Sequence, residues 1–270
     1  LDRHCVSCHN PERYDGRLDL CGDHTPQHSA AYYAMRRHAL VADNRNQPRS
    51  SLPPRAIGSS ASALMRYLDG THYKAKLSAE EVRLVRLWID TSATYPGTYA
   101  ALGCGTAYVN LHPLGKRCAS CHLKDGGTHQ GKPVKRWAFG GAGAPPATDP
   151  QSLCNLDRPK LSVLLRAPLA KEAGGLGLCG APVFGNGDDP DYRALLAQIE
   201  AAAVGLKQFR RFDMAGFQPN AHYLREMRRF GILDPKVAPG APVDPYATDQ
   251  KYWRSFWYQP PRPSTAGLAR

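Results

Sequence analysis

The sequence lacks long hydrophobic runs and a recognisable targeting segment. No unbroken apolar stretch reaches the roughly 18 residues that predict a membrane-spanning helix, so we expect no transmembrane segment. No secretory signal peptide opens the sequence, where residues 1–4 lead directly into a cysteine motif. Because that start is abrupt for a free N-terminus, we expect either a processed chain or one part of a longer polypeptide.

Acidic residues are scarce relative to basic ones. The sequence has 23 Asp and Glu against 35 Lys and Arg, which gives a formal net charge of +12 at pH 7. The basic residues are dispersed and no nucleic-acid-binding motif is present, so we expect no nucleic-acid partner. Such a charge favours an acidic redox protein or an anionic substrate, through an attraction that salt screens.

Two short motifs carry the strongest chemical signal in the sequence. Residues 5–9 and 118–122 both read Cys-x-x-Cys-His, the attachment signature of c-type haem. Two thiols at this spacing can each form a thioether to one porphyrin vinyl group, and the adjacent histidine then ligates the iron. We therefore predict two covalently bound haem c groups, held by Cys5, Cys8, His9, Cys118, Cys121 and His122. Covalent haem attachment takes place outside the cytoplasm, so we expect an extracytoplasmic protein.

Four cysteines remain once the haem motifs are set aside. In an oxidising compartment an even remainder suggests disulfides, and four cysteines allow three pairings. The pairing that follows the predicted domains joins Cys154 to Cys179 and Cys21 to Cys104, and buried free thiols are the alternative.

The fold expected around the motifs is mainly α. Gly (25) and Pro (23) are abundant, which predicts long loops and short helices. The two widely separated motifs favour two tandem cytochrome c-like domains, at residues 1–105 and 106–270. Periodicity and capping signals predict helices at residues 29–42, 60–69, 78–90, 157–165, 189–204 and 220–231.

Candidate second axial ligands are less clear than the motif histidines. For haem 1 we favour His72, because it lies in the loop before the last helix of the first domain, where the cytochrome c fold supplies its distal ligand. His38, expected on the apolar stripe of its helix, is the runner-up, and an oxygen ligand such as Tyr14 is a third possibility. For haem 2 we favour His222, with Met214 and His112 behind it. Two strong protein ligands favour electron transfer, whereas an open iron can bind a small substrate.

The C-terminal region is densely aromatic. Residues 252–258 read Tyr-Trp-Arg-Ser-Phe-Trp-Tyr. We expect this strip to pack back on the body of the protein, and the alternative is a docking strip for another subunit.

Several longer runs resemble the hydrazine synthase alpha-subunit family. They cover residues 51–62, 76–81, 88–90, 95–100, 167–175 and 219–223. The resemblance implies two c-type haem domains, one haem being an active-site candidate and the other a relay. In full-length family members a β-propeller precedes these domains. Short strands repeated at blade spacing are missing from this sequence, so the resemblance covers the dihaem part alone.

We therefore expect a dihaem c-type cytochrome that carries electrons between its haems and a redox partner. The enzymic alternative is a catalytic subunit of a hydrazine-synthase-like oxidoreductase, acting on small nitrogen compounds at haem 1. A third alternative is a structural subunit of a larger multihaem assembly.

Overall fold

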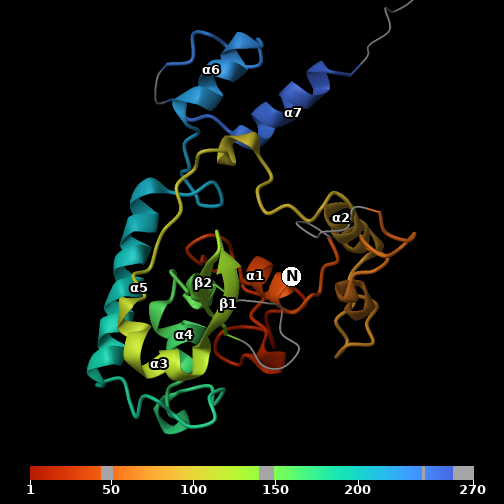
Figure 1. Cartoon of the computed structure of the whole chain (residues 1–270). Helices are drawn as coiled ribbons and strands as arrows, with labels where there is room; N and C mark the ends of the chain where they lie inside the picture. Colours follow the sequence, from red (N-terminus) through yellow and green to blue (C-terminus); the bar gives the residue numbers. More distant parts are fainter. Residues whose placement is uncertain (44–50, 140–148, 239–240, 258–270) are drawn as a thin grey trace, which may run out of the picture. The chain divides into compact units, whose positions relative to one another are not determined.

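The protein is mainly helical (Figure 1). The computed structural model describes residues 1–43, 51–139, 149–238 and 241–257. The α-helices in these ranges are α1 (Ala30–Arg37), α2 (Ala79–Asp90), α3 (Gly115–His122), α4 (Val163–Arg166), α5 (Pro190–Phe209), α6 (Ala221–Arg229) and α7 (Pro245–Ser255). Short 3-10 helices are η1 (Asp15–Arg17), η2 (Ala63–Tyr67), η3 (Tyr99–Ala101), η4 (His112–Leu114), η5 (Pro150–Leu153), η6 (Pro159–Leu161) and η7 (Lys171–Ala173). The strands described are β1 (Leu123–His129) and β2 (Lys132–Trp137), which form one antiparallel hairpin.

Two compact units divide the chain. The first unit contains Leu1–Tyr95 and Thr106–Phe209, and the second contains Pro96–Gly105 and Arg210–Arg270. Both Cys-x-x-Cys-His motifs therefore belong to the first unit. The assignment of one cytochrome c-like domain to residues 1–105 and another to residues 106–270 stays a prediction.

A hydrophobic core in the first unit gathers around α1 and α2. Its buried members are Leu20, Ala31, Ala34, Met35, Leu64, Leu68 and Ile89. Helix α1 begins after Ser29, whose hydroxyl accepts from the Tyr32 backbone N–H at 3.2 Å. It ends at Arg37, because His38 is the C-cap and Ala39 adopts a left-handed φ of 50°. The predicted extension to residue 42 is therefore wrong. So is the expected place of His38 on the apolar stripe, since its side chain is exposed.

The capping box predicted for α2 is confirmed. The Glu81 N–H donates to the Ser78 hydroxyl at 3.2 Å, and the Ser78 N–H donates to the Glu81 carboxylate at 2.8 Å. Helix α2 buries Ile89 in the core. The helix predicted at residues 60–69 is present only as η2, which ends just before Gly70, a glycine with a left-handed φ of 94°.

The hairpin β1–β2 follows α3, in a segment where the sequence patterns predict neither a helix nor a strand. Gln130 and Gly131 form its turn with φ values of 50° and 74°, the pair of left-handed residues that a tight two-residue hairpin needs. Leu123 pairs with Trp137, so the end of β2 returns to the end of α3. This return positions the second motif, as described below.

Helix α5 confirms the predicted start at Asp189 and Pro190. The Asp189 carboxylate accepts from the Asp191 N–H at 2.9 Å, and Pro190 occupies the first helical position. The helix continues to Phe209, beyond the expected residue 204, because Leu206 adds a further buried turn to its apolar face. In the described ranges, no helix is sufficiently long and apolar to cross a membrane.

A buried carboxylate organises the second unit. Asp249 of α7 accepts from the Thr98 hydroxyl (2.6 Å), the Tyr99 N–H (2.9 Å) and the Tyr223 hydroxyl (2.6 Å). These bonds tie α7 to α6 and η3. Sequence reading missed α7, although Asp244 followed by Pro245 is a helix-start signal and the Asp244 carboxylate caps the helix.

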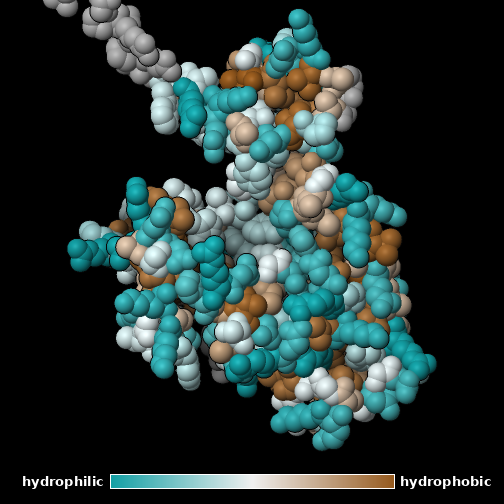
Figure 2. Space-filling view, turned by 180° about the vertical axis from the view of Figure 1, so that it is seen from behind, coloured by the Kyte–Doolittle hydropathy of each residue, from teal (hydrophilic) through white to brown (hydrophobic). Residues whose placement is uncertain are grey.

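The aromatic strip packs back only in part. Tyr252 is half-buried against the small core of the second unit, whereas Trp253, Phe256 and Trp257 are 52, 63 and 69% exposed. Figure 2 shows hydrophobic residues at the surface of this unit. Tyr258 lies outside the described residues. Phe230, expected on the apolar stripe of α6, is 59% exposed, so that assignment is wrong.

Candidate haem sites

The first motif folds into a single turn. The Cys8 N–H donates to the Cys5 carbonyl at 3.2 Å, and the His9 N–H donates to the same carbonyl at 2.9 Å. The turn brings the two cysteines and the histidine to one short segment. Cys5 and Cys8 are half-buried free thiols, as thioether formation requires, and burial raises the pKa of Cys5.

Backbone geometry fixes the orientation of His9. Its Nδ1 lies 2.8 Å from the Asp15 carbonyl oxygen. A carbonyl can only accept, so Nδ1 carries the hydrogen and Nε2 keeps its lone pair, the state that a metal-ligating histidine needs. The turn that presents this carbonyl has left-handed φ values at Tyr14 (53°) and Gly16 (65°). Gly16 also passes close to the imidazole, since a Cβ there would lie 3.6 Å from His9 Cε1.

His72, the favoured distal ligand, lies opposite His9. The two imidazole centroids are 5.9 Å apart and their planes differ by 10°. Two imidazoles that bind one metal from opposite sides, with metal–nitrogen bonds of about 2 Å, have centroids about 6 Å apart. The rings of Tyr67 and Tyr73 contact His72 at centroid distances of 5.1 and 5.0 Å. The structure thus brings together the two histidines that the sequence proposed for haem 1, with nearly parallel rings.

The second motif forms the last turns of α3. His122 Nδ1 lies 2.8 Å from the Ala138 carbonyl oxygen, so this histidine also carries its hydrogen on Nδ1 and leaves Nε2 free. The hairpin supplies that carbonyl, and the Ala138 N–H donates back to the His122 carbonyl at 2.7 Å. The ring of Phe139 stacks on the imidazole with a centroid distance of 4.6 Å. The two histidines therefore share one chemical state, although unrelated local structures hold them.

Arg117 fastens the second motif to the chain that follows it. Its guanidinium donates to Asp189 at 2.8 Å, to Asp191 at 3.1 Å and to the Val183 carbonyl at 2.6 Å. It also lies 5.1 Å from the centre of the Phe184 ring. Because Arg117 precedes the first motif cysteine, these contacts hold α3 at the start of the motif.

The distal candidates for haem 2 belong to different units of the chain. His112 is exposed in η4 of the first unit, while His222 and Met214 belong to the second unit, so their assignment to haem 2 stays a prediction. His222 Nδ1 lies 2.6 Å from Arg225 Nη2. Arginine can only donate, so Nδ1 accepts and Nε2 of a neutral ring carries the hydrogen. Ligation through Nε2 would require the other tautomer.

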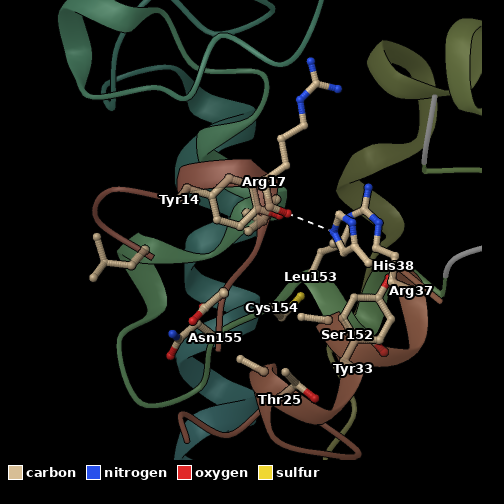
Figure 3. A pocket seen from close by; sticks show the side chains of 15 residues that line it. Tyr14, Arg17, Thr25, Tyr33, Arg37, His38, Ser152, Leu153, Cys154 and Asn155 are labelled. Carbon is tan, nitrogen blue, oxygen red and sulfur yellow. Dashed lines mark hydrogen bonds between the residues drawn. The ribbon is translucent and has the colours of Figure 1, made fainter. Parts of the chain in front are cut away.

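The remaining haem 1 candidates make protein contacts of their own. His38 Nε2 donates to the Arg17 carbonyl at 3.0 Å, and burial together with the Arg37 charge lowers the pKa of His38. Tyr14 is buried, and burial raises its pKa, so it is a neutral phenol at neutral pH. Both line the small cavity in Figure 3.

The four other cysteines are free thiols in the structure, so neither expected disulfide is present. Cys154 is buried and its thiol donates to the Pro150 carbonyl at 3.6 Å. Burial raises the pKa of Cys21 to about 12, with nearby Asp19 adding to the effect. Cys21 lies in the first unit and Cys104 in the second. In the described part of the chain, no three His, Cys, Asp or Glu side chains are grouped as ligands for a bare metal ion.

Comparison with known proteins adds no relative. No family model, no curated protein and no solved structure matches this chain.

Proposed function

We propose that this chain is a dihaem c-type cytochrome that passes single electrons between its two haems and a redox partner outside the cytoplasm. The observation that carries the proposal is the shared state of the two motif histidines. Each donates Nδ1–H to a backbone carbonyl at 2.8 Å and so presents Nε2 to a metal. Haem iron supplies one-electron redox chemistry when it is bound.

Haem attachment and the second iron ligand would come from residues of this chain. Cys5 and Cys8 would hold haem 1, and Cys118 and Cys121 would hold haem 2, through thioethers. His72, whose ring lies 5.9 Å from that of His9, would be the second ligand of haem 1, and two strong ligands would favour electron transfer over substrate binding at that iron. The net charge of +12 favours an acidic redox partner, with the haem propionates reducing the total.

The experiment that tests the proposal is haem counting on purified protein made in a host that attaches c-type haem. We expect two acid-stable haems per chain by mass spectrometry and by the pyridine haemochrome spectrum. The double variants C5S/C8S and C118S/C121S should each retain one. A wild-type chain that binds no covalent haem, or one that binds zinc at either motif, would contradict the proposal.

The enzymic alternative is a hydrazine-synthase-like catalyst acting on small nitrogen compounds at haem 1. It draws support from the family resemblance of the sequence runs. An open or weakly ligated haem 1 would favour it. Optical and electron paramagnetic resonance spectra separate the two functions, because a low-spin, six-coordinate haem 1 favours electron transfer. A high-spin component that binds nitric oxide or hydroxylamine favours catalysis.

The structural alternative draws on the exposed aromatic residues of α7. Deleting residues 245–270 would also remove Asp249 and its three buried bonds, so the better variant is W253S/W257S, which keeps the helix. Loss of a larger assembly by size measurement in this variant would favour a structural subunit. An unchanged assembly size would count against it.

A further inference from the structure

One arginine contacts the surroundings of both motif histidines. Arg37 is the last residue of α1, and its Nη2 donates to the Phe139 carbonyl at 3.4 Å. Phe139 follows the carbonyl that holds His122, and its ring stacks on the His122 imidazole. Arg37 therefore contacts a residue that packs against the histidine of the second motif.

A second neighbour of Arg37, Tyr14, lies in the turn that follows the first motif. Arg37 and Tyr14 line the same small cavity, and the charge of Arg37 opposes the rise in the phenol's pKa that burial causes. Tyr14 precedes the carbonyl that holds His9. Figure 3 shows Tyr14, Arg37 and His38 around a cavity of about 30 Å³, room for about one water molecule.

We infer that Arg37 is a positioning residue shared by the two haems, a single cation that lies beside Tyr14 at the first motif, bonds to Phe139 at the second, and raises both reduction potentials. The inference rests on the proposed function. It adds a physical link between the haems that the two motifs alone do not supply.

The sign of the effect follows from Coulomb's law. Reduction removes one positive charge from a haem iron, so a nearby cation repels the reduced haem less than the oxidised one. Arg37 therefore favours reduction. It is half-buried and lies beside the buried Tyr14, where solvent and salt screen its charge less than they screen a surface arginine.

The test is a spectroelectrochemical titration of the dihaem protein. In the R37Q variant we expect both midpoint potentials to fall, with the spin state of each haem unchanged from wild type. R37K keeps the charge and should restore most of both shifts. R36Q removes the same charge from the neighbouring exposed position, where Arg36 lies 5.9 Å from the Tyr32 ring centre, and should give much smaller shifts.

Two results would overturn the inference. One is that only one of the two midpoint potentials falls in R37Q, or that neither does. The other is an equal fall for R36Q. If R37Q does not accumulate with two haems, Y14F tests the first contact alone and should change the haem 1 potential more than the haem 2 potential, and equal changes would count against the link. A failure of the proposed function would be visible earlier, as wild-type protein without two covalent haems.

Discussion

The two motif sites reach the same imidazole chemistry by different routes. At the first, a tight turn through Gly16 supplies the carbonyl that binds His9, and a second histidine lies opposite at 5.9 Å. At the second, a β-hairpin supplies the carbonyl that binds His122, and the near neighbour is the Phe139 ring at 4.6 Å. The comparison teaches that one imidazole state, with the hydrogen on Nδ1, is reached through either a tight turn or a hairpin.

The largest expected effect comes from removing the His72 imidazole. The H72A variant should convert haem 1 from low spin to high spin and allow it to bind carbon monoxide in the ferrous state, because one of two strong ligands is gone. Absorption and electron paramagnetic resonance spectra measure the conversion. The matched variant H222A should leave haem 1 unaltered. A haem 1 spectrum that is the same in H72A and wild type would remove His72 from the site.

Sequence reasoning found the motif residues and His72 but not what orients them. The motifs are local patterns with one chemical meaning, and the place of His72 before α2 is a local property as well. The carbonyls of Asp15 and Ala138 have no sequence signature, because every residue carries one.

Several parts of the fold also depend on contacts that the sequence does not display. The hairpin was missed because β1 contains two glycines and little apolar alternation, and its clearest signal was the Gln130-Gly131 turn. The early end of α1 at Arg37 depends on the left-handed Ala39, a conformation that alanine rarely adopts. Capping signals fared better, since Ser78, Asp189 and Asn220 begin helices as predicted.

A matched pair of glycine variants tests the two proximal turns. G16A and G131A each place a Cβ on a left-handed residue, with φ values of 65° and 74°, at a cost of about 1–2 kcal/mol in the free energy of unfolding. G16A should broaden or shift the spectrum of haem 1, because its turn presents the Asp15 carbonyl. G131A should do so for haem 2, because its turn closes the hairpin whose opposite end presents the Ala138 carbonyl. Chemical denaturation measures the stability and resonance Raman spectra the iron–histidine bonds. If both variants perturbed the same haem, the separate turns would not be what orients the two histidines.

Replacing Arg117 tests whether its contacts hold the second motif in place. R117A removes contacts to two carboxylates and one carbonyl, and we expect a small fall in the free energy of unfolding, because solvent screens these exposed ion pairs. Chemical denaturation measures this fall, and haem counting should show more chains lacking haem 2 than chains lacking haem 1. As a control, R193A alters a surface arginine paired to Asp188 on the first turns of α5 and should leave haem loading unchanged. Equal loss of both haems in R117A would show a general folding defect instead.

The smallest expected effect is a loss of stability at low pH, through an acid-sensitive contact beside the first motif. Glu81 accepts from the Ser78 N–H and from His4, the residue before Cys5, and these contacts, led by the Ser78 backbone bond, lower its pKa from 4.5 to about 2. A depressed carboxyl pKa means that the contribution to stability is complete above pH 4.5 and is lost as the pH falls toward 2. The thermal midpoint of wild type should therefore decline more steeply than that of E81Q across this window, with the difference seen first in the haem 1 spectrum. E80Q changes the neighbouring carboxyl on the same turn and should retain the wild-type slope. Identical slopes for wild type and E81Q would show that the link between α2 and the first motif does not depend on this carboxylate.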